Sequence, residues 1–474
     1  MSAEAADVAT TSISSPTPGP RPVRRAPADL PFSFADRALV ERLGTERGEP
    51  GWLRTERMAA ADAFDALPIE SNRLYTTYLD LRLVDLMKAV PYVTTATVPT
   101  PGASSELPAG AVGLIALHED GVANLSLDPD ALAQGVVLET FGVALERDPE
   151  GFRAELEGGA GLPDDDKLAA LVRGFWSQGV RLHVPAGVHL DRPIVIRWAA
   201  GAPDRALIGR TRVTLGDGAQ ASIVEELTAS GSSVAGSGQA LLAGSLEVTL
   251  GRDAKLAVSG LQELSATTVA FQYRHAVIGE GATLHWALAH LGSRLVRSRV
   301  DNRLVGDRSS VEQVEIVFGS EDQLFDLTSY THHLGRDTTG NLLSKGALLD
   351  RARSFMKGMI VIDRSAVGTD SFLGEFGMNL GKATRSVAIP SLEIDQPDCR
   401  RAMHASAVGP IDESQLFYLE SRGIPPDDAR KFIVLGFLEP VVARVPLDDA
   451  QDRLRTLLED KWDAGHSAGA DAAA

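Results

Sequence analysis

A short pattern that recurs along the middle of the chain constrains its fold more than any other feature. Each copy has apolar residues, a glycine, two further residues and a small residue, and the clearest copies are Val213–Ala219, Val248–Ala254 and Ala276–Ala282. Their first glycines are spaced 251 − 216 = 35 and 279 − 251 = 28 residues apart. Weaker copies follow at Leu304–Gly306 and Asn379–Ala383. A local unit that returns at intervals of this length is typical of a chain that coils into stacked turns.

The residues between these copies favour strands. From Val180 onward the apolar period changes from about 3.6 residues to 2, and short β-type runs recur at Arg181–Val184, Ile194–Trp198, Arg212–Leu215, Ser222–Glu226 and Leu246–Leu250. Glycine permits sharp corner conformations, and a small alanine fits inside a coil. We therefore predict a mainly β chain whose core is a β-solenoid or parallel β-helix. A large β-sandwich remains the alternative, because irregular spacing is also typical of sandwiches.

Helical patterns flank this core. Asp164, Asp165 and Asp166 precede an apolar run and predict a helix start, which Gly179 would close as a left-handed residue. After Gly409 the pattern becomes helical again, and Gly423 is placed to end a helix. The expected organisation is a disordered tail over residues 1–30, a helical and mixed region over 31–163, the β-helix over 164–400, a helical region over 401–464 and a second disordered tail over 465–474.

Composition excludes several classes of function. The formal net charge is −18, which disfavours binding to nucleic acid or to an anionic membrane surface. Cys399 is the single cysteine, so the chain forms no internal disulfide and cannot alone hold an iron–sulfur cluster, which usually takes about four thiolates. No apolar run reaches the roughly 20 residues of a membrane helix, and the first residues lack a secretory pattern. We expect a cytoplasmic protein.

Catalytic motifs are absent from the sequence. Gly377–Ala383 resembles a phosphate-binding loop, but its first glycine is out of step by one and Ala383 stands where Ser or Thr would reach magnesium. His332 and His333 are adjacent on an expected strand, so they point to opposite faces and cannot share a metal without a kink. A solenoid that cleaves carbohydrate remains an unfavoured alternative, because acidic residues such as Asp217 follow turn glycines, where they serve local backbone bonding.

The last third of the chain carries a resemblance to a known family. The segment Met403–Ile424, MHASAVGPIDESQLFYLESRGI, is similar to the signature of the SufB/SufD family, and Ala429–Phe437 continues it. Upstream, Ser344–Leu348 with Phe355–Gly358 resembles a further family segment, and Asp165–Leu171 resembles the entry to the family's solenoid. The resemblance implies a right-handed parallel β-helix between helical ends and a non-catalytic scaffold subunit in iron–sulfur cluster assembly.

The family resemblance also implies partners. The chain would pair with a SufB-like subunit and dock the SufC ATPase, which would supply ATP hydrolysis; a homodimer without SufB stays open. The residues expected at the SufC contact are Leu416, Phe417, Tyr418, Arg422, Gly423, Ile424, Phe432 and Phe437. No cofactor is expected on the chain alone, but a transient iron–sulfur cluster or iron would be shared with SufB. The sequence leaves open whether a flavin takes part.

His404 matches the family's motif histidine and is the leading candidate for an iron or cluster ligand, with Cys399 and His333 as weaker candidates. The family often has a cysteine two positions before this histidine, where this chain has Ala402. That difference favours the SufD branch over SufB, since SufB needs its thiolate. The alternative is a SufB-like scaffold that accepts sulfur on Cys399.

Overall fold

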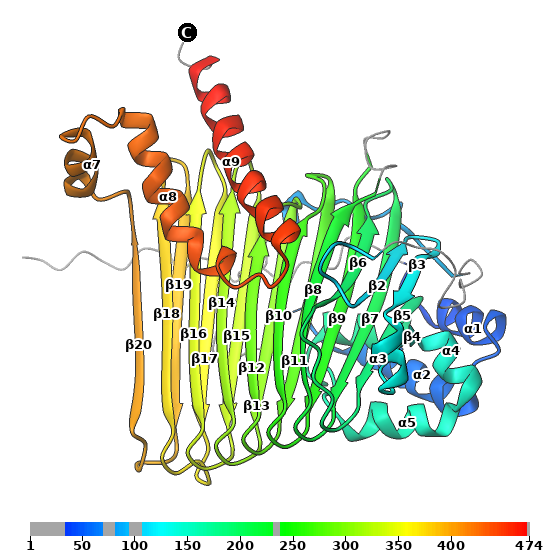
Figure 1. Cartoon of the computed structure of the whole chain (residues 1–474). Helices are drawn as coiled ribbons and strands as arrows, with labels where there is room; N and C mark the ends of the chain where they lie inside the picture. The colour runs from blue at the N-terminus through cyan, green and yellow to red at the C-terminus, as the bar shows by residue number, and fades with distance from the viewer. Residues whose placement is uncertain (1–33, 70–80, 94–106, 231–237, 472–474) are drawn as a thin grey trace, which may run out of the picture.

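The computed structural model describes residues 34–69, 81–93, 107–230 and 238–471, so the expected tail over residues 1–30 lies outside the described residues. Strands β5 to β20 alternate between two sheets and form eight turns of a solenoid (Figure 1). All strands of these turns pair in parallel with their neighbours in the same sheet. This confirms the predicted mainly β solenoid and excludes the sandwich, whose sheets are built from antiparallel strands.

Sheet A contains β5 (Gln178–Val184), β7 (Arg205–Leu215), β9 (Ala240–Leu250), β11 (Thr268–Ile278), β13 (Leu295–Leu304), β15 (Leu324–His333), β17 (Arg353–Ile362) and β19 (Arg385–Ile394). Sheet B contains β6 (Ile194–Ala200), β8 (Gln220–Ala229), β10 (Lys255–Glu263), β12 (Thr283–His290), β14 (Ser310–Gly319), β16 (Thr339–Leu348), β18 (Asp370–Asn379) and β20 (Arg401–Gly409). The inner faces of the two sheets form one apolar core along the axis of the coil.

The copies of the pattern from Val213–Ala219 to Leu304–Gly306 form the corner where the chain passes from sheet A to sheet B. The weaker copy Asn379–Ala383 instead lies at the other corner, between β18 of sheet B and β19 of sheet A, so it is not equivalent to the others. The first glycines of the pattern stack on one another, and a Cβ on Gly306 would collide with the backbone of Gly279 and Glu280. Two residues later the backbone has a positive φ, at 54° for Asp253 and 65° for Gly281. The small residue that follows is fully buried; the set is Ala219, Ala254, Ala282, Ser309 and Thr338. Close stacking of backbone on backbone therefore requires the glycines.

The N-terminal end of the solenoid is covered. Antiparallel strands β4 (Val137–Thr140) and β3 (Gly121–Leu127) end the two sheets, with β2 (Gly113–His118) between β3 and β6. Short β1 (Val90–Pro91) pairs with β7. The helical elements of this region are α1 (Arg37–Glu46), α2 (Gly51–Ala66), the 3-10 turn η1 (Leu81–Leu83), α3 (Pro129–Ala133), α4 (Phe141–Arg147), α5 (Pro149–Gly158) and α6 (Lys167–Phe175).

Asp166 joins this helical cover to sheet A. As predicted it begins a helix, and its carboxylate accepts hydrogen bonds from the backbone N–H groups at the start of α6. The same carboxylate accepts the Tyr273 hydroxyl at 2.7 Å and pairs with Arg299 at 3.0 Å. The prediction for Gly179 was wrong: it lies inside β5, where a Cβ would collide with the ring of Phe141.

The C-terminal helices are α7 (Glu413–Glu420), α8 (Pro426–Val442) and α9 (Asp448–Asp471). Two of them, α8 and α9, lie on the outer face of sheet B, and α7 protrudes beyond the last turn (Figure 1). Apolar residues of α8 and α9 pack on the outward side chains of β12, β14 and β16. Two expected boundaries differ from the structure. Residues 401–409 are the last strand and not a helix, because they pair with β18, and the expected tail over 465–474 is helical to Asp471.

The C-terminal end of the solenoid is open. Strands β19 and β20 form the last turn, and within the described residues neither has a further strand on its outer edge. These two strands are fully described and contain no buried residue, whereas the strands one turn earlier are largely buried. Long unpaired strand edges are sites at which another chain can pair.

The stacked corner leads to a stability prediction. Replacing Gly306 by Ala places a methyl group against backbone that cannot move aside, so the free energy of unfolding should fall by roughly 1–3 kcal/mol. Gly409→Ala is the matched control, because a Cβ at that position would have no atom within 4 Å and the φ of Gly409 is not positive. Urea unfolding of both variants measures the difference, and equal stabilities would contradict this account of the corner.

Candidate functional site

Three glutamates lie in one row along the inside of the coil. Strand register places Glu225, Glu315 and Glu375 at equivalent inward positions of β8, β14 and β18. All three are buried. Because a buried carboxylate is costly unless it is paired, the partners of each decide what that group can do.

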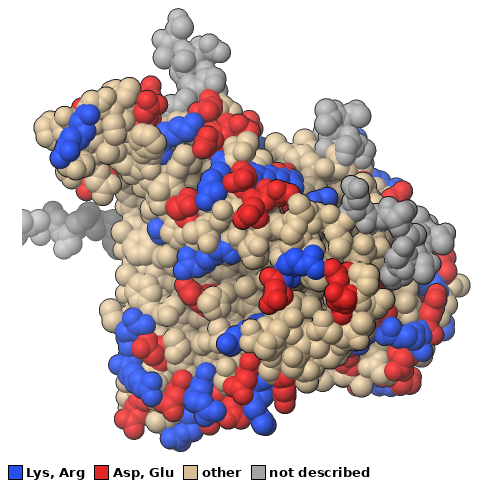
Figure 2. Space-filling model, in the orientation of Figure 1, with Lys and Arg blue, Asp and Glu red and all other residues tan. Residues whose placement is uncertain are grey.

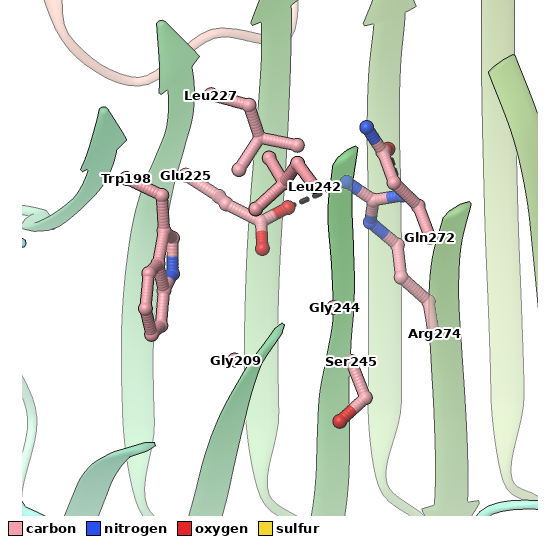
Figure 3. A pocket seen from close by; sticks show the side chains of 9 residues that line it. All are labelled: Trp198, Gly209, Glu225, Leu227, Leu242, Gly244, Ser245, Gln272 and Arg274. Atoms are coloured by element: carbon pink, nitrogen blue, oxygen red, sulfur yellow. Dashed lines mark hydrogen bonds and ion pairs between the residues drawn. The ribbon is translucent and has the colours of Figure 1, made fainter. Parts of the chain in front are cut away.

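Glu225 is paired inside the solenoid. Arg274 donates to its carboxylate and also to the amide oxygen of Gln272, at 3.2 Å (Figure 3). The pair borders a cavity of about 20 Å³, and the indole of Trp198 forms another part of its wall. That volume suits a single water molecule. Gly244 keeps the space open, because it has no side chain on this inner face.

Glu315 is paired as well. Its Oε1 lies 2.8 Å from His290 Nε2 and accepts the Ser298 hydroxyl at 2.8 Å. Burial alone would raise the pKa of Glu315, but the hydrogen bonds and charge of its neighbours outweigh burial and lower it. The polar network continues through Gln313 to Asn302. Glu315 is therefore a satisfied structural carboxylate.

Glu375 differs from the other two glutamates. Its residue is 1% exposed, and among the described residues its Oε2 has no hydrogen-bond partner. Burial raises the pKa of Glu375 to about 8, opposed by a hydrogen bond from the backbone N–H of Ile389. It lies one turn inside the open end, and none of the sequence motifs pointed to it. A signal was nevertheless present: Glu375 interrupts the run Phe372–Phe376, which is otherwise free of charge.

His404 lies on the inner face of β20, in the last turn. It pairs in register with Leu373, whose side chain is buried inside the coil, and Glu375 pairs with Ser406 two positions further along. His404 is exposed because no further turn covers this face within the part of the chain that the structure describes. Cys399 is partly exposed and packs beside Ala402 against the inner cluster that contains Leu373. His404 therefore lies in the last turn, and Glu375 lies in the turn before it.

His333 is engaged inside the coil. Its Nδ1 lies 2.8 Å from the Thr338 hydroxyl and its Nε2 lies 3.0 Å from the Ser371 hydroxyl. Burial, followed by the charge of His332, lowers the pKa of His333 to about 4. With both nitrogens bonded, the geometry gives His333 a structural role. In the described ranges no group of three or more His, Cys, Asp or Glu side chains is placed to hold a metal ion.

Helices α7 and α8 present an exposed aromatic surface. Phe417 is 73% exposed, Tyr418 56% and Phe432 60%, and no residue of α7 is buried. The guanidinium of Arg422 lies 5.1 Å from the Tyr418 ring, and Gly423 has the positive φ of 85° expected at the end of the helix. Figure 2 shows that this protruding end is mostly uncharged. Leu416 and Ile424 are half-buried behind it.

Phe437, expected at the same surface, instead faces the solenoid. It packs against the cluster between α8 and sheet B, and the ammonium of Lys345 lies 4.7 Å from its ring. Lys345 also donates to the Phe437 carbonyl at 3.0 Å. On α9, Lys461 donates to Gln323 Oε1 at 2.7 Å, and burial lowers the pKa of Lys461 to about 7. Two lysines thus fasten the C-terminal helices to the solenoid, one from each side of the interface.

Comparisons with known proteins agree with this architecture. Residues 198–437 match the family model described as "SUF system FeS cluster assembly, SufBD core domain". The chain is 24% identical over 438 residues to the iron–sulfur cluster assembly protein SufD of Bacillus subtilis, covering 90% of this chain and 98% of the relative. It is 24% identical over 444 residues to an iron–sulfur cluster assembly SufBD family protein of Staphylococcus epidermidis, covering 90% and 94%. A SufBD family protein of Mycobacterium tuberculosis is 27% identical over 309 residues, covering 64% and 75%.

None of the helices within the described ranges has both the length and the apolar character needed to cross a membrane.

His333 leads to a prediction about acid stability. Its folded pKa of about 4 lies below the ordinary 6.5, so its contribution to stability is complete above pH 6.5 and is lost as the pH falls toward 4. Between pH 7 and 4.5 this loss should be about 2 kcal/mol. We expect His333→Asn to be less stable than wild type at pH 7, with a smaller further loss at pH 4.5, in urea unfolding at the two pH values. Parallel pH dependence of the two proteins would contradict the assignment.

Proposed function

Because this chain belongs to the SufBD family of iron–sulfur cluster assembly proteins, we propose that it is a SufD-type scaffold subunit that docks a SufC ATPase and pairs with a SufB-like chain. The observation that carries the proposal is that one solenoid has two surfaces that no other described part of the chain covers. One is the aromatic surface of α7 and α8, and the other is the open last turn. The chain has no nucleotide-binding motif, so ATP hydrolysis would come from the partner.

The aromatic surface suits a protein partner. Aromatic side chains such as Phe417 and Phe432 are enriched in the centres of protein interfaces, where their burial supplies much of the binding energy. The Arg422 guanidinium beside Tyr418 adds a polar group at the same place. Since α8 is fastened to the outer face of sheet B, movement of an ATPase on α7 would be transmitted to the solenoid.

The open last turn suits a partner with a similar fold. The unpaired edges of β19 and β20 are each nine or ten residues long, and a parallel strand edge is matched by the edge of another solenoid or a related sheet. Pro390 in β19 lacks a backbone donor, which proline can tolerate at an edge position. A SufB-like subunit would cover this end, or a second copy of this chain where SufB is absent.

A transient cluster would form, or an iron ion would bind, where His404 meets that partner. The chain alone offers His404 and, at the adjoining corner, the partly exposed Cys399, so further ligands would come from the other subunit. If Cys399 accepted sulfur, as in the SufB-like alternative, Cys399→Ser would abolish cluster assembly. The SufD-type proposal expects assembly to continue in that variant.

The docking proposal is tested by replacing exposed aromatic residues with a charge. Phe417→Asp and Phe432→Asp place a carboxylate in the proposed interface, so each should reduce recovery of the ATPase with the tagged chain by about tenfold or more. Thermal unfolding should stay unchanged, because both side chains are exposed. Met87→Asp, an equally drastic change at an exposed apolar residue near the other end, is the matched control. Undiminished recovery of the ATPase would refute the assigned surface.

The role of His404 is tested in the assembled complex. His404→Ala should lower transfer of iron–sulfur clusters to an acceptor protein while leaving complex formation intact, since an exposed imidazole contributes little to folding. His285→Ala, which removes a half-exposed imidazole from β12, serves as the control and should transfer clusters normally. If His404→Ala instead prevents assembly with the partners, the histidine is structural and the ligand assignment fails.

A further inference from the structure

Glu375 has a setting that folding alone does not explain. The other two glutamates of the inner row each have a basic partner, Arg274 for Glu225 and His290 for Glu315. The carboxyl of Glu375 has no cation, and one of its oxygens has no hydrogen-bond partner among the described residues. An unsatisfied buried carboxyl destabilises a protein, and leucine is compatible with this row, as Leu288 shows. A buried carboxyl that has one hydrogen bond from the backbone and no basic partner points to a ligand.

The carboxyl of Glu375 is directed toward the open end. It accepts a hydrogen bond from the backbone of Ile389, which belongs to the last turn of sheet A, and its Oε1 lies beside Gly358, against which the side chain of Leu373 also packs. On the opposite sheet the last turn places Ser406 in register with Glu375 and His404 two residues before it. With strands about 4.8 Å apart and a rise of about 3.3 Å per residue, the Cα atoms of Glu375 and His404 are about 8 Å apart.

That separation lets both side chains reach one ion. The carboxyl extends from β18 into the interior, and the imidazole extends from β20 on the same inner face. Imidazole nitrogen and carboxylate oxygen are a ligand pair that Fe²⁺, Co²⁺ and other divalent transition metals accept. A cation that enters from the open end would meet His404 first and the buried carboxyl behind it.

We propose that Glu375 and His404 form a half-site for a single divalent transition-metal ion, with the remaining coordination positions filled by water or by the subunit that covers the open end. This half-site rests on the scaffold function proposed above. It adds Glu375 as a second ligand beside His404 and names the substrate as an iron ion delivered for cluster assembly. It also explains why a carboxyl without a cation is retained one turn inside the open end. A metal ion would give Glu375 the kind of partner that Arg274 and His290 provide for the other two glutamates.

The experiment titrates the purified full-length chain with Co²⁺ alone and follows the visible d–d absorption and the heat of binding. Wild type should bind one Co²⁺, and Glu375→Gln and His404→Ala should each weaken binding by about tenfold or more. Glu315→Gln is the matched control, the same substitution in the same row at a carboxyl that already has a partner. His285→Ala is the control for the loss of a surface imidazole. It remains usable as a control if Glu315→Gln does not fold. Thermal unfolding establishes that each variant is folded.

Two results would overturn the half-site: Co²⁺ affinity unchanged in Glu375→Gln, or no stoichiometric Co²⁺ binding to wild type. The proposed function is read separately, by recovery of the ATPase and the SufB-like chain with the same tagged variants. If the partners are recovered while Co²⁺ binding is independent of Glu375, the half-site alone fails. If no partner is recovered with wild type, the scaffold proposal fails whatever the metal titration shows.

Discussion

Each turn of this solenoid is completed by its neighbour. Backbone groups of one turn bond to the next, and corner glycines such as Gly279 and Gly306 stack backbone on backbone. Each strand of a middle turn has a neighbouring strand on both sides. The first and last turns each have one edge that another element must cover. At the N-terminal end, antiparallel strands and the helices anchored by Asp166 supply that cover. At the C-terminal end no described element does so, and the last turn is the least buried part of the solenoid.

The open end and the C-terminal helices are adjacent in the chain and in space. The chain leaves β20, forms α7 beyond the last turn, and returns over sheet B as α8 and α9 (Figure 1). Partly buried hydrogen bonds from Lys345 and Lys461 to carbonyl and amide oxygens hold these helices to the coil. A partner on the aromatic surface would therefore act on the turn that carries His404. If an ATPase docks on this surface as proposed, this connection would carry its movement to the open end.

Much of the fold could be predicted from the sequence, because corner glycines and small residues leave a local pattern. Gly335 is a further corner glycine that stacks on Gly306, but the sequence pattern did not reveal it. Polar His332 and His333 precede it where the other copies have apolar residues. The strand over 401–409 was missed because its three alanines give a weak β signal, and pairing with β18 determines its conformation. His404 could be found from the family resemblance. Glu375 was visible in the sequence as a charge within an apolar run, but its lack of a basic partner could not be recognised, because that depends on residues of several different turns.

The central claim is that the last turn is completed by another subunit, and hydrogen–deuterium exchange measures this directly. Amides of residues 385–394 and 401–409 should exchange rapidly in the isolated chain and become protected in the complex purified through a tag on this chain, while β9 and β11 stay protected in both. Unchanged exchange of both edge strands on complex formation would show that partners bind elsewhere and would contradict the account.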